Sequence, residues 1–224
     1  MKKQRVVAFV PIKLNSQRLP MKNILPLGEY SLSWYIFDSL LKVKDIDDVY
    51  VFCSDEEIKK HIPSQVKFLK RDRYLDGDLV KGQEIYQSFI ESVDSDIYIL
   101  SHTTSPFLAA NTIEKALSKM LLEDYDSALS VQKKQTFAWF EEKPLNYELN
   151  NIPRTQDITP VFIETSGFFM FRKNIFEGYR RRIGFKPFLQ EVDDVEAIDI
   201  DTKEDYEFAI QVYEQVKQRA YINN

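Results

Sequence analysis

The chain has 224 residues, enough for one large α/β domain with a substantial core. Its 35 acidic and 30 basic residues give a formal charge of −5, which argues against a general nucleic-acid binder. We find no run of about eighteen apolar residues and no apolar leader of signal length, so neither a membrane span nor secretion is expected. A single cysteine, Cys53, excludes an internal disulfide and suits a reducing cytoplasm, and two histidines are too few for a histidine-built metal site.

A buried strand followed by a cationic loop opens the chain. Residues 6–10 form a short β-branched apolar run, which is typical of a strand covered on both faces. The loop after it contains Lys13, Arg18 and Lys22 and several prolines, which block early helix formation. Loops at the carboxyl ends of central strands bind ligands in α/β sheets, and three cations there suit a triphosphate. A basic surface turn would have the same composition, and the loop lacks the glycines of Walker-type or dinucleotide-binding loops.

Helices and strands then alternate along the chain. The pattern predicts a helix at residues 31–43, a strand at Asp48–Cys53, a short helix capped by Ser54 and a strand at residues 66–69. This β-α-β-α-β order favours a doubly wound sheet. Further helices are expected at residues 81–93, 111–122 and 203–219, and further strands at residues 96–100, 127–131, 162–171 and 195–201.

Three polar segments interrupt this alternation. Residues 71–78 read RDRYLDGD and residues 101–106 read SHTTSP, and each follows an expected strand. Either could be an exposed turn, and His102 could simply bond a loop carbonyl. Residues 132–160 are polar, punctuated by prolines and rich in aromatic side chains. A loop of that length is usually functional or an interface.

Two aspartates close the last expected strand. Side chains two apart on a strand share a face, so Asp199 and Asp201 are expected to point together at about 7 Å spacing. Carboxylates that close repel one another unless a cation lies between them. Oxygen ligands without histidine or thiolate suit Mg²⁺ or Mn²⁺. The alternative is that Asp201 caps the last helix while Asp199 is buried and hydrogen-bonded.

The segments resemble, in order and over nearly the whole chain, the CMP-sugar synthetase (acylneuraminate cytidylyltransferase) family. PIKLNSQRLPMKN is similar to P-A-R-x-x-S-x-R-L-P-x-K-N, and RDRYLDGD is similar to R-P-x-x-L-A-x-D. SHTTSP resembles the start of Q-P-T-S-P-L-R, RTQD the motif R-x-Q-D, and FIETSGFFMF the motif Y-x-x-N-G-x-x-Y-x-F. IDIDTKEDYEFA resembles the closing motif of the family.

The resemblance implies a fold, a reaction and a set of site residues. The implied fold is a single α/β domain over residues 1–224, a three-layer, Rossmann-like nucleotidyltransferase. Its mixed, mostly parallel sheet has helices on both faces, and residues 133–163 form a dimerisation arm. The implied partners are CTP, an acidic sugar, Mg²⁺ or Mn²⁺ at Asp199 and Asp201, and a second copy in a homodimer. Lys22 and Asp201 are the implied catalytic residues. The implied nucleotide ligands are Lys13, Asn15, Ser16, Arg18, Lys22, Asn23, Arg71 and Asp78. The implied sugar ligands are His102, Thr104, Ser105, Trp139, Arg154, Gln156 and Ser166.

Departures from the family pattern gather on the sugar side. His102 replaces glutamine, Ser166 replaces asparagine, and Trp139 lies near the place of a lysine in sialate-specific members. Trp139 could equally form an ordinary dimer contact. On the nucleotide side Lys13 replaces an arginine, which keeps the charge but loses the planar fork.

We therefore expect CMP transfer from CTP to the anomeric hydroxyl of a nonulosonic-type sugar, with release of pyrophosphate. No dedicated base is evident, although His102 is a candidate. Two alternatives remain. One is a cytidylyltransferase for another anionic hydroxyl compound, although an octulosonate is disfavoured because SHTTSP lacks a Q-G-D-E-P-like motif. The other is a transferase that uses D-x-D on a finished nucleotide sugar.

Overall fold

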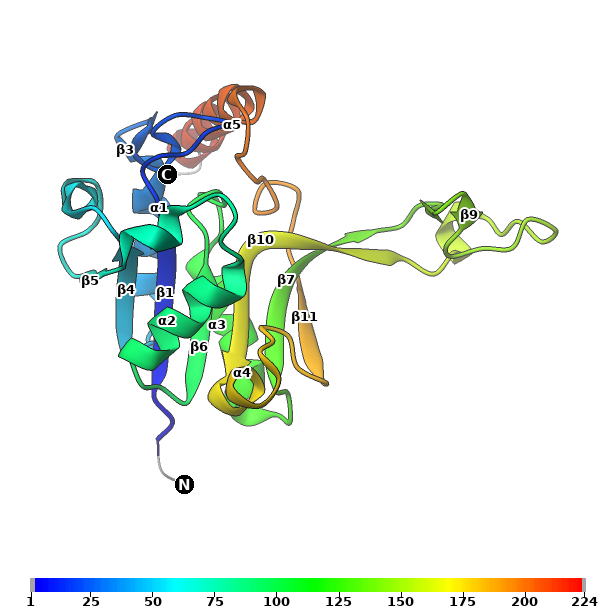
Figure 1. Cartoon of the computed structure of the whole chain (residues 1–224). Helices are drawn as coiled ribbons and strands as arrows, with labels where there is room; N and C mark the ends of the chain where they lie inside the picture. The colour runs from blue at the N-terminus through cyan, green and yellow to red at the C-terminus, as the bar shows by residue number, and fades with distance from the viewer. Residues whose placement is uncertain (1–2, 223–224) are drawn as a thin grey trace.

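A seven-stranded sheet forms the centre of the computed structural model, which describes residues 3–222, with side chains described as far as residue 218. The strand order is β11-β7-β10-β6-β1-β4-β5, as Figure 1 shows for most of the sheet. Within the described chain, β10 is antiparallel to its neighbours β6 and β7, and the other pairings in this sheet are parallel. The strands are β1 (Val6–Ile12), β4 (Asp48–Cys53), β5 (Lys67–Lys70), β6 (Ile97–Ser101), β7 (Ser127–Lys134), β10 (Val161–Arg172) and β11 (Pro187–Glu191).

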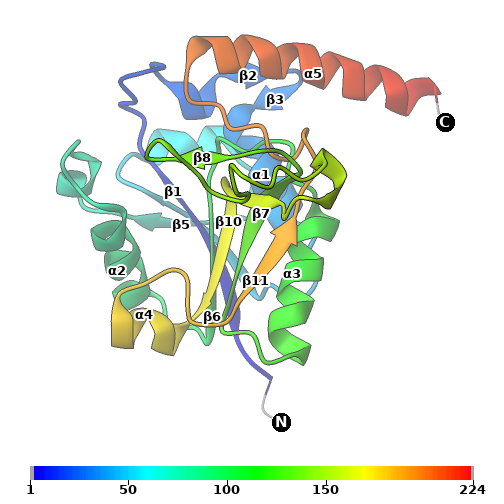
Figure 2. The same ribbon diagram turned by 90° about the vertical axis from the view of Figure 1, so that its right-hand side faces the viewer.

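Helices cover both faces of this sheet, as the view along its edge shows (Figure 2). One face carries α1 (Leu32–Leu41) and α3 (Ala110–Leu122), and the other carries α2 (Gly82–Ser92) and α4 (Lys173–Tyr179). Strand β1 divides its side chains between the two layers, with Ala8 and Val10 in the α1–α3 core and Val7 and Phe9 in the α2–α4 core. This two-residue period is what a doubly covered strand requires. The predicted three-layer α/β fold, with a mixed and mostly parallel sheet, is confirmed.

The last helix, α5 (Lys203–Ile222), packs beside the small hairpin of β2 (Pro26–Leu27) and β3 (Tyr30–Ser31), as Figure 2 shows. Buried Leu27, Leu32, Ile200 and Ala209 form a third, smaller core there. Within residues 3–222, no helix combines the length and the apolar character that crossing a membrane requires.

Short elements complete the chain, and one of them corrects an expectation. The helix after β4 is a 3₁₀ turn whose cap is Asp55, because its carboxylate accepts from the backbone N–H of Glu57 at 3.0 Å. Ser54 is not the cap, since its hydroxyl is hydrogen-bonded to Asp76 instead. Helix α4 and strand β11 were not expected from the sequence pattern. The short elements are η1 (Lys22–Ile24), η2 (Glu56–His61), η3 (Arg73–Asp76), η4 (Thr155–Asp157), β8 (Trp139–Phe140) and β9 (Lys143–Pro144).

The strand expected at residues 195–201 is also wrong. Residues 194–197 form a turn in which Asp193 Oδ1 accepts the backbone N–H groups of Val195 and Glu196 at 3.0 and 2.8 Å. The segment beyond the turn is held by the N–H of Ile200, which donates to Thr104 O at 2.9 Å. It therefore passes over the loop after β6 rather than joining the sheet. Asp199 and Asp201 do not share a strand face.

Strands β7 and β10 continue past the sheet as a two-stranded arm that carries residues 135–160 away from the body (Figure 1). The arm exposes large apolar side chains, among them Trp139 at 55%, Phe140 at 64% and Ile152 at 65% of their surface. An isolated hairpin of this kind is marginally stable in water, so such side chains suit a contact with another surface. Dimerisation through residues 133–163 stays a prediction.

A bulge in β10 brings its backbone against β7 at the root of the arm. The register shifts between Glu164, opposite Val131, and Phe169, opposite Leu129. A Cβ on Gly167 would lie 2.8 Å from Ser130 Oγ, the same atom that accepts the N–H of Phe168 at 3.1 Å. Gly167 therefore allows β10 to approach Ser130 of β7 closely.

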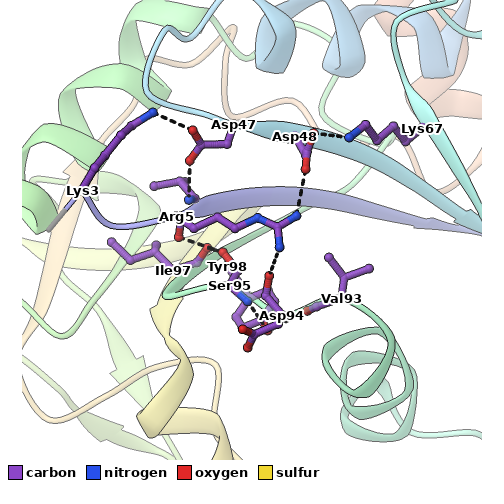
Figure 3. Close-up of polar contacts among 11 residues, drawn as sticks. Lys3, Arg5, Asp47, Asp48, Lys67, Val93, Asp94, Ser95, Ile97 and Tyr98 are labelled. Atoms are coloured by element: carbon purple, nitrogen blue, oxygen red, sulfur yellow. Dashed lines mark hydrogen bonds and ion pairs between the residues drawn. The ribbon is translucent and has the colours of Figure 1, made fainter.

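Charged side chains tie the amino end of β1 to its two neighbouring strands (Figure 3). Arg5 pairs with Asp48 at 2.9 Å and also donates to Asp94 O at 2.6 Å. Asp48 is shared with Lys67 of β5. Burial alone would raise the pKa of Asp48, but the hydrogen bonds from Lys67 and Arg5 outweigh it and hold that pKa below its ordinary value.

This lowered pKa makes the contribution of Asp48 depend on pH. A carboxylate with a depressed folded-state pKa stabilises fully above its unfolded pKa of about 3.9 and loses that contribution as pH falls through the folded value. Asp48→Asn is expected to lower the free energy of unfolding by up to about 1 kcal/mol at pH 7. The difference from the wild type should narrow below pH ~4. Urea denaturation at pH 7, 5, 4 and 3 measures the free energy of unfolding of both proteins. A difference between them that stays constant over this pH range would refute the role given to the lowered pKa of Asp48.

Candidate active site

The cationic loop after β1 meets the carboxyl-terminal segment directly. Lys22 Nζ lies 3.0 Å from Asp201 Oδ1 and donates to Ile200 O at 2.8 Å, although these residues are 179 and 178 positions apart in sequence. Arg18 Nη2 lies 3.0 Å from the same oxygen of Asp201. The residues enclose a pocket of about 470 Å³ that is lined by Lys13, Ser16, Gln17, Arg18, Leu19, Lys22, Asp78 and Asp201.

Asn23 holds this loop in place from beneath. Its amide nitrogen donates to Lys13 O at 2.7 Å, and its amide oxygen accepts the hydroxyl proton of Thr103. Asn23 is buried, with 6% of its surface exposed. Asn23 therefore fixes the loop against the segment after β6. The sequence did not single out Thr103, because this contact joins two segments that are distant along the chain.

A second pocket continues from the first and contains Arg71. Lys13 and Asp78 belong to both pockets and pair with each other at 3.0 Å. Arg71 is 3% exposed, and Asp76 Oδ1 accepts from its Nε at 3.1 Å and from its Nη2. This pocket of about 290 Å³ is lined by Pro11, Lys13, Arg71, Leu75, Gly77, Asp78, Val80, Gly82, Ile85, Tyr86 and His102. One continuous site thus has a polar, cationic end and a more apolar end.

Asn15 lies outside these two pockets. It lines a neighbouring groove together with Ser54, Asp55 and Arg73. Of the nucleotide ligands implied by the sequence, Lys13, Ser16, Arg18, Lys22, Arg71 and Asp78 line the two pockets. The roles of these residues toward a nucleotide stay predictions.

The cap of α5 does not use the carboxylate of Asp201. Asp205 Oδ2 accepts the backbone N–H groups of Asp201 and Thr202 at 3.0 and 2.8 Å, while Thr202 Oγ1 accepts the N–H of Asp205 at 3.2 Å. This reciprocal pattern is a capping box built by Thr202 and Asp205. The N–H of Thr202 is the main cause of the lowered pKa of Asp205. The alternative in which Asp201 caps the helix is excluded.

Asp199 carries a buried oxygen that lacks a partner. Its Oδ2 accepts from Ser166 Oγ at 2.8 Å, whereas Oδ1 has no hydrogen-bond partner among the described residues. A buried acceptor without a donor is costly, and a hard divalent cation would relieve that cost. No group of three or more His, Cys, Asp or Glu side chains in the described residues is placed to hold a metal. The unpartnered oxygen of Asp199 and the carboxylate of Asp201 are ligand atoms of the type that Mg²⁺ and Mn²⁺ prefer.

His102 connects the second pocket to the bulge in β10. Its Nδ1 lies 2.8 Å from Ser166 O, and a carbonyl oxygen only accepts, so Nδ1 carries the proton and Nε2 is an acceptor. Burial lowers the pKa of His102, which keeps the imidazole neutral at pH 7. His102 thus bonds a backbone carbonyl that belongs to strand β10 rather than to a loop, and it lines the pocket as well.

The remaining residues expected at the sugar side are not brought together in one chain. Ser105 is 1% exposed, and Thr104 contributes its carbonyl oxygen to the segment of Ile200. Trp139, Arg154 and Gln156 belong to the arm, which projects away from the body of the chain (Figure 1).

A family model described as Cytidylyltransferase matches residues 7–224. The chain belongs to the cytidylyltransferase family. Its motifs had indicated the same family, so that resemblance is confirmed. The N-acylneuraminate cytidylyltransferase of Oncorhynchus mykiss is 24% identical over 186 residues, which are 78% of this chain and 43% of that protein. The pseudaminic acid cytidylyltransferase of Campylobacter jejuni is 26% identical over 183 residues, 73% of this chain and 76% of that protein.

The chain has the same fold as a solved structure of CMP:2-keto-3-deoxy-manno-octonic acid synthetase complexed with CTP. Its TM-score is 0.74 at 16% identity, and the match covers 94% of this chain and 99% of that one. The chain spans about half the length of the N-acylneuraminate cytidylyltransferases from fish that it matches, with 43% for Oncorhynchus mykiss and 51% for protein A of Danio rerio.

Proposed function

We propose that the chain transfers CMP from CTP to the anomeric hydroxyl of an acidic, nonulosonic-type sugar and releases pyrophosphate. The observation that carries this proposal is the contact of Lys22 and Arg18 with Asp201, beside a pocket that contains Arg71. Two of the relatives, from Oncorhynchus mykiss and Campylobacter jejuni, are named for sugar acids, N-acylneuraminate and pseudaminic acid.

The triphosphate of CTP would occupy the cationic pocket. Lys13 and Lys22 are each paired with one acid at 3.0 Å, and a bound polyphosphate would take over these pairings with charge-assisted hydrogen bonds. The cytosine would enter the part of the second pocket beside Arg71, which leaves the part beside His102 for the acceptor. Since Nε and Nη2 of Arg71 are bound to Asp76, we assign its Nη1 donor to the pyrimidine.

In the reaction, the anomeric oxygen attacks the α-phosphorus, a P–O bond to that oxygen forms, and the bond to the β-phosphate oxygen breaks. Lys22, Lys13 and Arg18 would stabilise the charge that develops on the phosphate oxygens, which is where such transfers gain most of their rate. The hydroxyl proton would go to a nearby acceptor, for which the neutral Nε2 of His102 is the candidate.

Asp199 and Asp201 are the residues that would hold Mg²⁺ or Mn²⁺. When bound, the ion supplies positive charge to the phosphate oxygens. The buried, unpartnered Oδ1 of Asp199 supports this assignment, because it lacks a donor in the described structure.

A homodimer would complete the site. The exposed apolar side chains of the arm, including Trp139 and Phe140, support contact with a second copy. Arg154 and Gln156 would then reach the sugar side of the partner pocket. Cys53 is a buried free thiol, which suits the reducing cytoplasm that we propose as its location.

Pyrophosphate release distinguishes this proposal from its alternatives. We would incubate the protein with CTP, Mg²⁺ and N-acetylneuraminic acid, pseudaminic acid or 3-deoxy-D-manno-octulosonic acid. Release with a nonulosonic acid is expected, and release with the octulosonate alone would favour another acceptor class. Transfer from a CMP-sugar to a second acceptor, without use of CTP, would instead support the sugar-transferase alternative.

A further inference from the structure

The loop after α4, residues 180–186, is fixed to the sheet by several hydrogen bonds. Asp126 accepts the backbone N–H groups of Phe185 and Lys186 at 2.7 and 3.1 Å, and Ser127 Oγ accepts that of Gly184 at 2.8 Å. A Cβ on Gly184 would lie 2.3 Å from Asp126 Oδ1, so this contact requires glycine. The loop is therefore a firm support for the side chains that it carries.

Arg182 extends from this loop to the wall of the second pocket. Its Cζ lies 3.5 Å from the ring centroid of Phe169, and its Nη1 donates to Tyr86 Oη at 3.2 Å. Tyr86 and His102 both line the pocket, and His102 packs edge-on against Phe169 with centroids 6.3 Å apart. Burial is the main cause that lowers the pKa of His102, and the positive charge of Arg182 adds to it. Arg182 thus lies beside the second pocket, on the side of strand β10 and the root of the arm.

The charge of Arg182 is weakly neutralised in this position. Its Nη2 lies 3.7 Å from Glu164 Oε2, which is too long for a hydrogen bond. The side chains of Arg182 and Glu164 are 33% and 53% exposed, and a pair of that kind contributes little to stability. Lys13 and Lys22, by contrast, each have a carboxylate at 3.0 Å.

We infer that Arg182 binds the carboxylate of the acceptor and so sets the preference for acidic sugars, an inference that rests on the proposed function. A guanidinium presents parallel donors that match a carboxylate, and Phe169 and Tyr86 already orient this one. Within one chain the arm brings no cation to this pocket, because Trp139 is neutral and Arg154 lies on the arm away from the body, where it pairs with Asp157 at 2.6 Å.

Direct binding tests this inference without requiring turnover. The full chain is loaded with a CTP analogue that has a methylene group between its α- and β-phosphates. Calorimetry then measures the affinity for N-acetylneuraminic acid, pseudaminic acid and 3-deoxy-D-manno-octulosonic acid, and for the methyl ester of each. The wild type should bind at least one free acid about tenfold to a hundredfold more tightly than its ester. Arg182→Gln should remove that ratio, and Arg182→Lys should restore part of it.

Arg180→Gln is the matched control, since it removes a charge from the same loop on the side that faces the groove between α2 and α4. It should leave both the ratio and the affinity for the CTP analogue unchanged. Glu164→Gln provides a second test that does not disturb Arg182. Removing the neighbouring negative charge should strengthen binding of the free acid by up to about fivefold and leave binding of the ester unchanged.

Three results would overturn the inference. The first is a wild type that binds none of the three free acids more tightly than its ester, and the second is an Arg182→Gln variant that keeps the wild-type ratio of acid affinity to ester affinity. The third is a loss of that ratio in Arg180→Gln. Failure of the proposed function gives a different signature, because the wild type would then release no pyrophosphate from CTP while the binding ratio still reports on Arg182.

Discussion

Replacing Asp199 and Asp201 together by asparagine is expected to lower kcat by about a thousandfold or more while the protein stays folded. The reason is that Asp201 joins the cationic loop to the carboxyl-terminal segment, and Asp199 holds a buried oxygen without a donor. Asparagine keeps the shape of both side chains and removes the charge that would hold a divalent cation. Pyrophosphate release with CTP, Mg²⁺ and the preferred acidic sugar measures the loss.

Asp194→Asn is the control for this double variant. Asp194 belongs to the same segment but is an exposed surface residue paired with Lys134 at 3.0 Å. Its replacement should leave kcat within about twofold, because exposed ion pairs contribute little. Thermal unfolding of the double variant should stay near that of the wild type. Unchanged pyrophosphate release in a folded double variant would refute the role of the two aspartates.

Lys22→Met is expected to lower kcat by about a hundredfold and to weaken CTP binding. Lys22 is the least exposed of the paired cations in this pocket, with 12% of its side chain exposed, against 34% for Lys13 and 68% for Arg18. A buried cation acts at lower effective dielectric, so its removal affects the phosphate charge most. Methionine keeps the apolar stem, which separates the charge from the packing.

Single-turnover rates and CTP affinity measure the two effects of Lys22→Met separately. Lys60→Met is the control, because Lys60 pairs with Glu57 on the surface and is 72% exposed. Lys22→Arg should keep part of the affinity but not the full rate, since a guanidinium is larger and directs its donors differently. A Lys22→Met variant with the wild-type rate would show that the reaction does not need the charge of Lys22.

The sequence was informative where a local pattern determines the structure. The alternation of Val7, Ala8 and Phe9 between two cores follows from the period of a β-strand. The cationic loop was also visible, because Lys13, Arg18 and Lys22 follow a strand that had to be central. The family motifs then connected this loop with Asp201, and the structure brings the two together.

The sequence was uninformative where contacts between distant segments decide. Residues 195–201 alternate like a strand, yet the hydrogen bond from Ile200 to Thr104 O holds them above the sheet. The amide of Asn23 contacts Lys13 O and the Thr103 hydroxyl, and the contact with Thr103 joins two segments that are distant along the chain. Arg182 lies in a loop without any motif, and its place at the pocket depends on Phe169 and Tyr86, which come from other elements.

The central claim is that cations from the amino-terminal loop and aspartates from the carboxyl-terminal segment bind one CTP. A crystal structure of the full chain with CTP and Mg²⁺ tests it most directly. We expect the triphosphate between Lys13, Arg18 and Lys22, the ion at Asp199 and Asp201, and the cytosine beside Arg71. A nucleotide bound elsewhere, or one whose phosphates leave the Lys22–Asp201 pair unchanged, would contradict the claim.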